Sequence, residues 1–255
     1  MFSLFRRWRH NRIIKRSALT NDAWQQSFSQ MPLLHSLSDA DADRLKNLVI
    51  LFLHKKSFTG AQGMRVSDEM KLLIAMQACL PILNLGLEWY RGWVSIIVYP
   101  DSFVPQTNYA DDSGIVHRRQ NVLSGESWLR GPVILSWQGV DRSGELDGSN
   151  LVIHEFVHKL DMLNGVANGF PPLHDDMSNR EWSDNFSHAF DDFQGKLNAG
   201  KSTGIDSYAA TSPAEFFAVL SEVFFERPDW IEEAYPKVYL QLVDFYRQTP
   251  FTRRE

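Results

Sequence analysis

Apolar residues recur every three or four positions in several separate segments of the chain. This spacing places them on one face of an α-helix, so each segment is predicted to form an amphipathic helix. Ser38 or Asp39 precedes one of these segments, and Ser67 precedes the next, in the position of a helix-capping side chain. The expected helices cover residues 21–30, 39–59, 67 to 81 or 86, 151–163, 182–197, 213–225 and 230–246.

Two other segments have the composition of β-strands. Residues 93–99 and 133–137 are rich in β-branched and aromatic residues, which fit a pleated sheet better than a helix. The connection between them, residues 101–131, is long and polar, with one strand-like patch at residues 114–118. Long connections in compact domains are often functional, so this one is expected either to border a substrate cleft or to form a hairpin with decorated turns.

The order of these elements predicts an α+β fold that is mostly helical and has a small sheet. With 255 residues and 44% hydrophobic content, the chain is long enough to bury a substantial core. We divide it into a basic N-terminal tail at residues 1–20, an N-terminal helical part at residues 21–90 and a catalytic part at residues 91–255. The last two parts are alternatively one continuous domain.

Composition excludes several classes of protein. The single cysteine, Cys79, excludes a disulfide framework and a cysteine-rich zinc site. No apolar stretch reaches the length of about 18 residues that a membrane span requires, and the N-terminus lacks the apolar segment of a secretory signal. We therefore expect a cytoplasmic protein.

The net charge of −5 hides a basic N-terminus. The first twenty residues carry six Lys and Arg and no Asp or Glu, so the remainder of the chain carries −11. Apolar residues alternate with these charges, which is compatible with a segment that contacts anionic lipid or nucleic acid. A mobile solubilising tail is the more common interpretation of such a terminus, and the acidic remainder argues against general nucleic-acid binding.

The main chemical feature is an HExxH motif, formed by His154, Glu155 and His158 inside the apolar run 151–163. In a helix the two histidines lie about one turn apart on one face, where a single zinc ion can bind both imidazoles. Glu155 then lies beside the metal, placed to act as the general base for a water molecule, which is its role in metallopeptidases. The alternative is a chance spacing on an ordinary helix, but unpaired His and Glu are costly among apolar neighbours.

A catalytic zinc site normally has three protein ligands, so a third ligand is expected from elsewhere in the chain. Glu215 is the strongest candidate because it lies at the start of an apolar helix, with Tyr208 seven residues earlier. A competing explanation is local, since the sequence from Ser212 to Glu215 matches a capping box. The other candidate carboxylates are Asp175, Asp176, Glu181 and Glu222.

Two acidic residues are candidates for orienting the histidines. Metal-bound histidines usually donate the proton of their second ring nitrogen to a carboxylate or a carbonyl. Asp161, three residues after His158, is expected either in this role or as a cap at the helix end. Glu222 is expected to orient the other histidine.

These motifs resemble the Mlc titration factor A family. The resemblance rests on the HExxH segment, on the spacing from Tyr208 to Glu215 and on Ser221-Glu222, and it covers nearly the whole chain. It implies a cytoplasmic bacterial zinc metallopeptidase with aminopeptidase activity and a zincin-like fold, with the sheet beside the HExxH helix. It also implies an active site similar to that of the catalytic domain of anthrax lethal factor.

The resemblance further implies roles for single residues and a protein partner. His154, His158 and Glu215 would bind one zinc ion per chain, Glu155 would be the general base and Tyr208 would stabilise the tetrahedral intermediate. The implied partner is the glucose-responsive transcription repressor Mlc, whose binding would affect glucose-uptake genes. The alternative function is a non-catalytic protein that sequesters Mlc and has a regulatory or vestigial zinc site. The natural substrate and the oligomeric state stay open.

Overall fold

The computed structural model describes residues 2–101, 107–110, 116–119, 125–127 and 131–250, with side chains for residues 5–101 and 131–250. Its helices are α1 (Phe2–Lys15), α2 (Asn21–Ser29), α3 (Asp39–Lys55), α4 (Asp68–Cys79), α5 (Trp137–Asp141), α6 (Leu151–Asp161), α7 (Asn179–Asn198), α8 (Pro213–Glu226), α9 (Pro228–Ala234) and α10 (Pro236–Tyr246). Short 3₁₀ turns lie at Pro32–Leu34, Leu87–Tyr90, Met162–Asn164 and Ser207–Ala210. The strands are β1 (Ser57–Gly60), β2 (Ser95–Tyr99), β3 (Thr107–Ala110), β4 (Val116–Arg119), β5 (Gly125–Ser127) and β6 (Val133–Ser136).

The main sheet has the strand order β1-β2-β6-β5. Strands β1, β2 and β6 are parallel, while β5 pairs antiparallel with β6. Every side chain of β6 is buried, as expected for a strand that is covered on both faces. Helix α6 packs on β5 and β6, so the sheet lies beside the helix that carries the HExxH motif. The predicted class, α+β and mostly helical with a small sheet, is confirmed.

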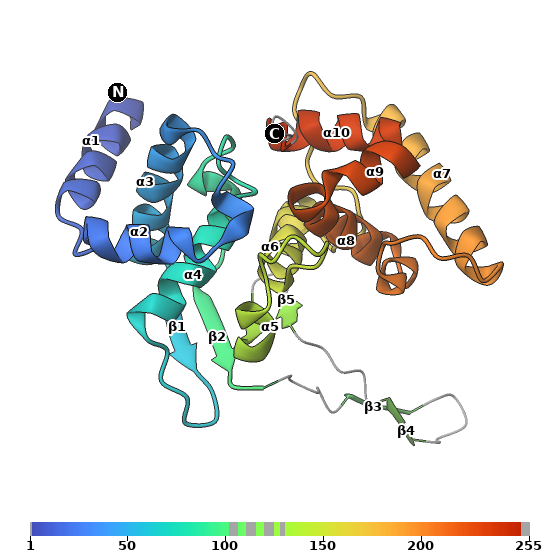
Figure 1. Ribbon diagram of the computed structural model, residues 1–255, viewed down its shortest axis with the longest axis horizontal. Coiled ribbons are helices and arrows are strands. Elements are labelled where there is room, and N and C mark those ends of the chain that lie inside the picture. Colours follow the sequence, from blue (N-terminus) through green and yellow to red (C-terminus); the bar gives the residue numbers. More distant parts are fainter. Residues whose placement is uncertain (1, 102–106, 111–115, 120–124, 128–130, 251–255) are drawn as a thin grey trace.

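The long connection before β6 is described only in part. Strands β3 and β4 form a separate antiparallel pair within it (Figure 1). The predicted strand-like patch corresponds in part to β4, while residues 114 and 115 lie outside the described residues. The cleft role expected for residues 101–131 falls largely on residues without described side chains and stays a prediction.

Helix α6 lies in the middle of the molecule, with α1–α4 on one side and α7–α10 on the other (Figure 1). It begins after Asn150, whose Oδ1 accepts a hydrogen bond from the backbone N–H of Ile153 at 2.9 Å. This is an N-cap, and it satisfies one of the donors left free at a helix start. Five apolar residues of α6 are fully buried, namely Val152, Ile153, Phe156, Val157 and Leu160, while Leu151 at its start is partly buried.

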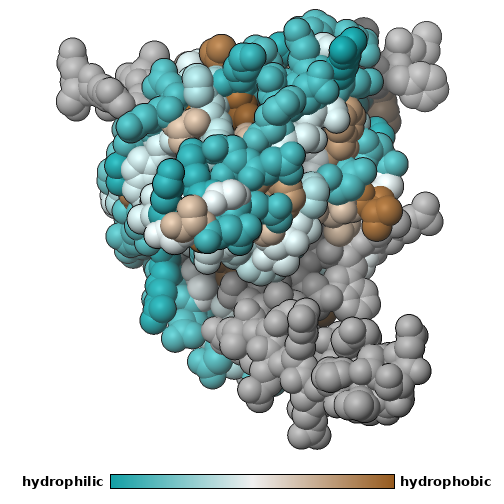
Figure 2. All heavy atoms as spheres, turned by 90° about the vertical axis from the view of Figure 1, so that its right-hand side faces the viewer, coloured by the Kyte–Doolittle hydropathy of each residue, from teal (hydrophilic) through white to brown (hydrophobic). Residues whose placement is uncertain are grey.

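Helix α8 packs along α6 and supplies much of the hydrophobic core. Residues 216–226 of this helix are all buried, since apolar side chains occupy nearly its whole circumference. Helix α7 contrasts with it, because only one of its faces is buried, through Trp182, Phe186 and Phe193. The face of the molecule that carries α7 is mostly hydrophilic, with scattered apolar patches (Figure 2).

Several element ends differ from the predicted ones, and prolines explain two of the differences. The helix expected at residues 230–246 is two helices, α9 and α10, because Pro236 lacks the N–H and the space that a continuous helix needs. Helix α4 ends at Cys79, shortly before Pro81. Trp137, expected at the end of a strand, begins α5 because Ser136 caps that helix by accepting the N–H of Gly139.

The basic N-terminal segment forms helix α1 over residues 2–15. Ile13 and Ile14 of this helix pack in part against the hydrophobic core, and α1 lies along α3. The division into residues 1–20, 21–90 and 91–255 stays a prediction. Across the described part of the chain, every helix is too short or too polar to span a lipid bilayer.

Candidate metal centre

His154 and His158 come from successive turns of α6 and face each other. Their ring centroids are 4.8 Å apart, and the two Nε2 atoms are separated by 3.2 Å. Both side chains are almost completely buried, with 9% and 7% of their surfaces exposed. The predicted geometry of the HExxH helix, two imidazoles on one face one turn apart, is therefore present.

Glu215 reaches the histidines from the first turn of α8. Its Oε2 lies 3.0 Å from Nε2 of His154 and 3.3 Å from Nε2 of His158. The ligand atoms of the three residues lie within 4.8 Å of one another, and no other such group of His, Cys, Asp or Glu occurs among the described residues. Of the other proposed third ligands, Asp176 pairs with Arg247, and Asp175 and Glu181 are exposed. Glu222 does reach the centre, but at the second ring nitrogen of His154.

The local explanation of Glu215 as part of a capping box is only half correct. Ser212 does cap α8, because its Oγ accepts a hydrogen bond from the backbone N–H of Glu215 at 3.2 Å. The carboxylate of Glu215, however, turns towards the two histidines. One residue thus provides a backbone donor to the helix cap and an anionic side chain to the centre.

Glu222, two turns further along α8, orients His154 from the other side of the ring. Its Oε1 lies 2.7 Å from Nδ1 of His154, and its Oε2 accepts the backbone N–H of Asn150 at 2.5 Å. A proton on Nδ1 leaves the lone pair of Nε2 directed towards Glu215 and His158, as a metal ligand requires. The expectation that Glu222 orients a histidine agrees with this contact.

A buried hydrogen-bond network next to Glu222 was not predicted from the sequence. The side-chain amide of Asn150 donates to Oε1 of Glu226 at 2.9 Å and to Oε1 of Gln77 at 2.8 Å. Oε2 of Glu226 accepts the backbone N–H of Leu146 at 2.6 Å, and burial raises the pKa of this carboxyl to about 7. The sequence does contain one indication of this network, because Glu222 and Glu226 lie one turn apart on an otherwise apolar helix.

The observed role of Asp161 is structural, because its side chain binds backbone groups of the loop after α6. Its Oδ2 accepts the backbone N–H groups of Asn168 and Gly169, at 2.8 and 2.7 Å. Burial raises its pKa to about 6, against the effect of these hydrogen bonds. Gly169 has a φ of +78°, and a Cβ there would meet the carbonyl oxygen of Pro213 at 2.5 Å. Asp161 therefore holds the chain after α6 close against the start of α8, which is neither of its two expected roles, because its side chain neither caps a helix end nor contacts the free ring nitrogen of His158.

His158 differs from His154 in its second ring nitrogen. Its Nδ1 is buried and has no hydrogen-bond partner among the residues that the structure describes. Burial lowers the pKa of His158, so this ring is neutral and offers a lone pair.

Tyr208 lies at the open side of the centre. It belongs to the 3₁₀ turn before α8, where the carboxylate of Asp206 accepts its backbone N–H at 2.9 Å. The ring centroid lies 6.0 Å from that of His154, and 39% of the residue is exposed. Burial, together with the charges of Glu215 and Glu155, holds the pKa of the phenol far above its ordinary value. The hydroxyl group is therefore a stable hydrogen-bond donor.

Glu155 is 3% exposed and follows the first histidine on α6. Its charge raises the pKa of Tyr208 and opposes the lowering of the pKa of Lys159, which burial brings to about 8. The charge of Glu155 therefore acts on both the Tyr208 phenol and the Lys159 ammonium.

The charges of the centre favour a cation among its ligand atoms. Burial alone would lower the pKa of His154, but the carboxylates of Glu222 and Glu215 hold it well above its ordinary value. Burial alone would raise the pKa of Glu215, but hydrogen bonds from His154 and His158 hold it well below its ordinary range. A metal ion at this position takes the place of the imidazole proton, and two imidazoles with one carboxylate form a common ligand set of catalytic zinc. The residues present therefore fit zinc.

Comparisons with known proteins agree with this chemistry. The model of the family described as glucose-regulated metallo-peptidase M90 matches residues 5–247. Mlc titration factor A from Yersinia pestis (strain Pestoides F) is 39% identical over 236 residues, which cover 90% of this chain and 86% of the relative. Mlc titration factor A from Yersinia pseudotuberculosis serotype O:1b (strain IP 31758) is similar to the same extent.

Proposed function

The chain belongs to the glucose-regulated metallopeptidase family M90, and from this premise we propose that it is a zinc-dependent peptidase. The family resemblance inferred from the sequence is thereby confirmed. The observation that carries the proposal is the meeting of His154, His158 and Glu215 from two helices, with Glu155 beside them.

We assign His154, His158 and Glu215 as the ligands of one zinc ion. When bound, zinc supplies a Lewis acid that polarises a peptide carbonyl and lowers the pKa of water. Glu222 holds the ring of His154 in the tautomer that presents Nε2 to the centre. His154, His158 and Glu222 are buried and Glu215 is partly buried, which limits competing water at these side chains.

Glu155 and Tyr208 are the residues that act on the substrate. The carboxylate of Glu155 takes a proton from the attacking water and returns it to the leaving amine. The hydroxyl of Tyr208, kept protonated by its surroundings, donates a hydrogen bond to the negative charge that develops on the peptide oxygen. The exposed part of Tyr208 marks the side from which a peptide approaches.

The test uses Glu155→Gln, because glutamine keeps the shape of the side chain but cannot accept the proton. We expect one zinc per chain in both proteins by metal analysis, and hydrolysis of aminoacyl chromogenic substrates lowered about 10²- to 10⁴-fold in the variant. Glu181→Gln, an exposed change of the same kind on α7, is the matched control and should keep the wild-type rate. Wild-type turnover by zinc-loaded Glu155→Gln would remove Glu155 from the reaction.

Aminopeptidase specificity is a narrower proposal, and it rests on the family resemblance. Peptides of defined sequence distinguish it from internal cleavage, because removal of single N-terminal residues leaves a ladder of products. A product set that lacks this ladder would contradict the aminopeptidase assignment and leave the peptidase assignment intact.

A second proposed function is binding of the repressor Mlc, which the name of the relatives supports. The two functions are separable in one experiment, capture of Mlc by wild type and by Glu155→Gln. Binding by both proteins, with hydrolysis only by wild type, supports independent activities. Binding by a protein that never hydrolyses peptides favours the alternative, a non-catalytic protein that sequesters the repressor. The expected cytoplasmic location stays a prediction.

A further inference from the structure

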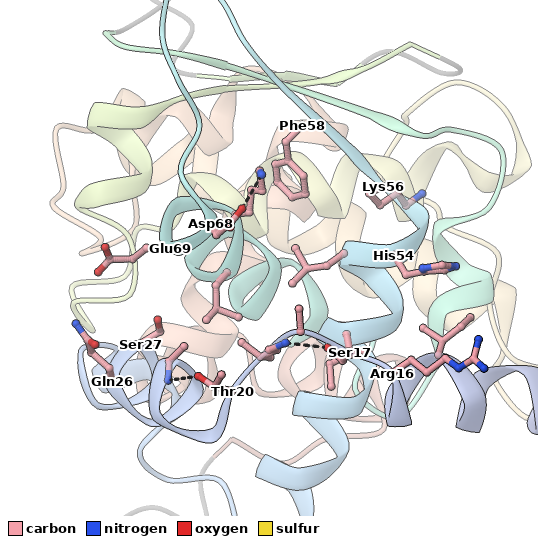
Figure 3. A pocket seen from close by; sticks show the side chains of 18 of the residues that line it. Arg16, Ser17, Thr20, Gln26, Ser27, His54, Lys56, Phe58, Asp68 and Glu69 are labelled. Atoms are coloured by element: carbon pink, nitrogen blue, oxygen red, sulfur yellow. Dashed lines mark hydrogen bonds and ion pairs between the residues drawn. The ribbon is translucent and has the colours of Figure 1, made fainter.

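The N-terminal part of the molecule encloses a cavity separate from the metal centre. It has a volume of about 1020 Å³ and lies among residues of α1, α2, α3, β1 and α4 (Figure 3). None of the residues that form the metal centre lines it. Small-ligand sites have volumes of about 300–1,000 Å³, so the cavity has room for a complete small molecule.

The inner wall of this cavity is apolar. Ile50 of α3 and Leu72 of α4 are almost completely buried there, with 7% and 3% of their surfaces exposed. Leu53 and Phe58 extend the same wall and are partly buried. Ile50 is buried but does not belong to the contiguous hydrophobic core. Its side chain is therefore part of the cavity wall. Such a wall suits a hydrocarbon chain better than water.

The rim of the cavity is basic on the side of α1. Arg9, Arg12 and Arg16 follow one another at helical spacing, line the cavity and are exposed. Among the described residues none of the three has a carboxylate within ion-pair distance, whereas Arg6 of the same helix lies 3.7 Å from Glu88. Arg12 also lies over the ring of Trp8, at 5.6 Å.

The side of the cavity opposite the arginines carries two acidic residues, one of which is already paired with a lysine. Asp68 and Glu69 lie across from Arg16 and His54 (Figure 3). Asp68 is already paired with Lys71, whose Nζ lies 2.8 Å from its Oδ1. Lys56 adds a further basic group, but its ammonium donates to the carbonyl oxygens of Tyr90 and Trp93. The cationic charge available to a ligand is therefore on the arginines.

We propose that this cavity binds an amphiphilic anion. Its hydrocarbon chain lies along Ile50, Leu53 and Leu72, and its carboxylate or phosphate head lies among Arg9, Arg12 and Arg16. A guanidinium group binds both head groups through paired hydrogen bonds, and an apolar wall beside it selects an anion that carries a chain. The site is independent of the peptidase proposal, because it shares no residue with the metal centre.

The first test is calorimetric titration of the full chain with dodecanoate and with dodecyl phosphate. We expect saturable binding of one molecule per chain that weakens as salt is added. The double variant Arg9→Gln/Arg12→Gln should weaken binding at least about tenfold, since it removes two charge-assisted contacts. The matched control is Arg7→Gln/Lys15→Gln, which removes the same charge from α1 outside the cavity and should change affinity less than about twofold.

A second variant tests the cavity itself. Leu53→Trp fills the apolar wall and should weaken dodecanoate binding at least about tenfold. Leu240→Trp, at a position of α10 that is 59% exposed, is the control. Circular dichroism shows whether each variant folds, and the arginine variant decides alone if Leu53→Trp does not fold. Equal affinity of the arginine variant and its control, or no binding of either amphiphile by wild type, would overturn the proposal.

The anion has two conceivable sources, a free amphiphile or a membrane lipid, and vesicle flotation distinguishes them. Phe5 and Trp8 of α1 are 66% and 56% exposed, so they are available to a lipid surface. Binding to dodecanoate without binding to phosphatidylglycerol vesicles supports a free ligand. Binding to these vesicles, but not to phosphatidylcholine vesicles, that is lost in Leu53→Trp supports a lipid. Vesicle binding that persists in Leu53→Trp, without binding of free amphiphile, would overturn the cavity as the site.

Discussion

The two sides of α6 are built on different physical principles. The side that faces α8 carries the histidines, and each polar contact there has a partner from a distant part of the chain. The other side carries Phe156, whose ring lies 5.7 Å from Phe52, 5.2 Å from Tyr90 and 5.5 Å from Trp93. The first side depends on particular atoms, whereas the second depends on the area and shape of apolar groups.

This difference teaches which changes each side tolerates. On the aromatic side, another apolar residue of similar volume preserves most of the stabilisation, because dispersion and burial are not directional. On the polar side, even a change that keeps the shape removes a charge or a donor, and buried partners then lose their compensation. Changes on the aromatic side should therefore affect unfolding, and changes on the polar side should affect metal binding.

The largest effect is expected from Phe156→Ala on the aromatic side. The ring is fully buried, so its removal leaves a cavity and should lower the free energy of unfolding by about 3–5 kcal/mol. Urea unfolding of the metal-free protein measures this change. Leu240→Ala, at an exposed position, should change it by less than about 1 kcal/mol. A similarly small change in Phe156→Ala would show that the aromatic contacts do not stabilise α6.

Glu222→Gln, on the polar side, should affect zinc binding more than the stability of the metal-free protein. Loss of the anionic acceptor at Nδ1 of His154 should weaken zinc binding about 10- to 100-fold. The unfolding free energy of the metal-free protein should fall by less than in Phe156→Ala, because glutamine keeps the volume of the side chain and leaves no large cavity. Competition with a chromophoric chelator measures the affinity, and the exposed Glu232→Gln is the control. Unchanged zinc affinity would contradict the orienting role of Glu222.

Lys56 is an exception on the aromatic side of α6, because it is a buried basic residue among the aromatic rings. Its ammonium lies 3.3 Å from the centroid of Trp93, and burial lowers its pKa to about 7. Because the unfolded chain holds this proton up to a higher pH, the stability of the folded protein should rise with pH between these pKa values.

The effect of Lys56 is measurable as a difference between variants. From pH 7.5 to 9.5 the free energy of unfolding of wild type should rise by about 2 kcal/mol relative to Lys56→Met. Lys237→Met, at an exposed position of α10, should keep the wild-type slope. Parallel pH profiles of wild type and Lys56→Met would show that the buried ammonium does not lose its proton in this range.

The smallest effect is expected from Ser212→Ala at the start of α8. Loss of the hydrogen bond to the backbone N–H of Glu215 should lower the free energy of unfolding by about 1 kcal/mol. Zinc affinity should fall by less than about tenfold, because the carboxylate of Glu215 stays anchored by the rest of the helix. A larger loss of zinc affinity, measured as for Glu222→Gln, would show that the cap also positions the ligand.

The sequence predicts those features whose signal is local. Apolar periodicity located α6 and α8, and the spacing of His154 and His158 indicated a metal site before any fold was known. Strands β2 and β6 were recognised from their β-branched composition, but most of β1 falls within the helix expected at residues 39–59. Trp137 was assigned to the wrong element because the capping role of Ser136 was missed. Local chemistry of this kind leaves a pattern within a few residues.

Features that depend on packing between distant segments could not be predicted in the same way. Asn150 and Glu222 are 72 positions apart, and only the packing of α6 on α8 brings them together. Asp161 binds backbone N–H groups, which no side-chain pattern reports. The choice of Glu215 over the other acids likewise required either the fold or a family resemblance, because its position at a helix start has a sufficient local explanation.

The three proposed ligands come from two helices, α6 and α8, and this has a consequence for biosynthesis. The ribosome completes α6, with both imidazoles, before it has made Glu215, which lies beyond α7. A nascent chain of that length holds only part of the ligand set, and domains form as units once enough of their sequence has emerged. The complete ligand set of the candidate metal centre therefore forms only after α8 has been translated and has packed against α6.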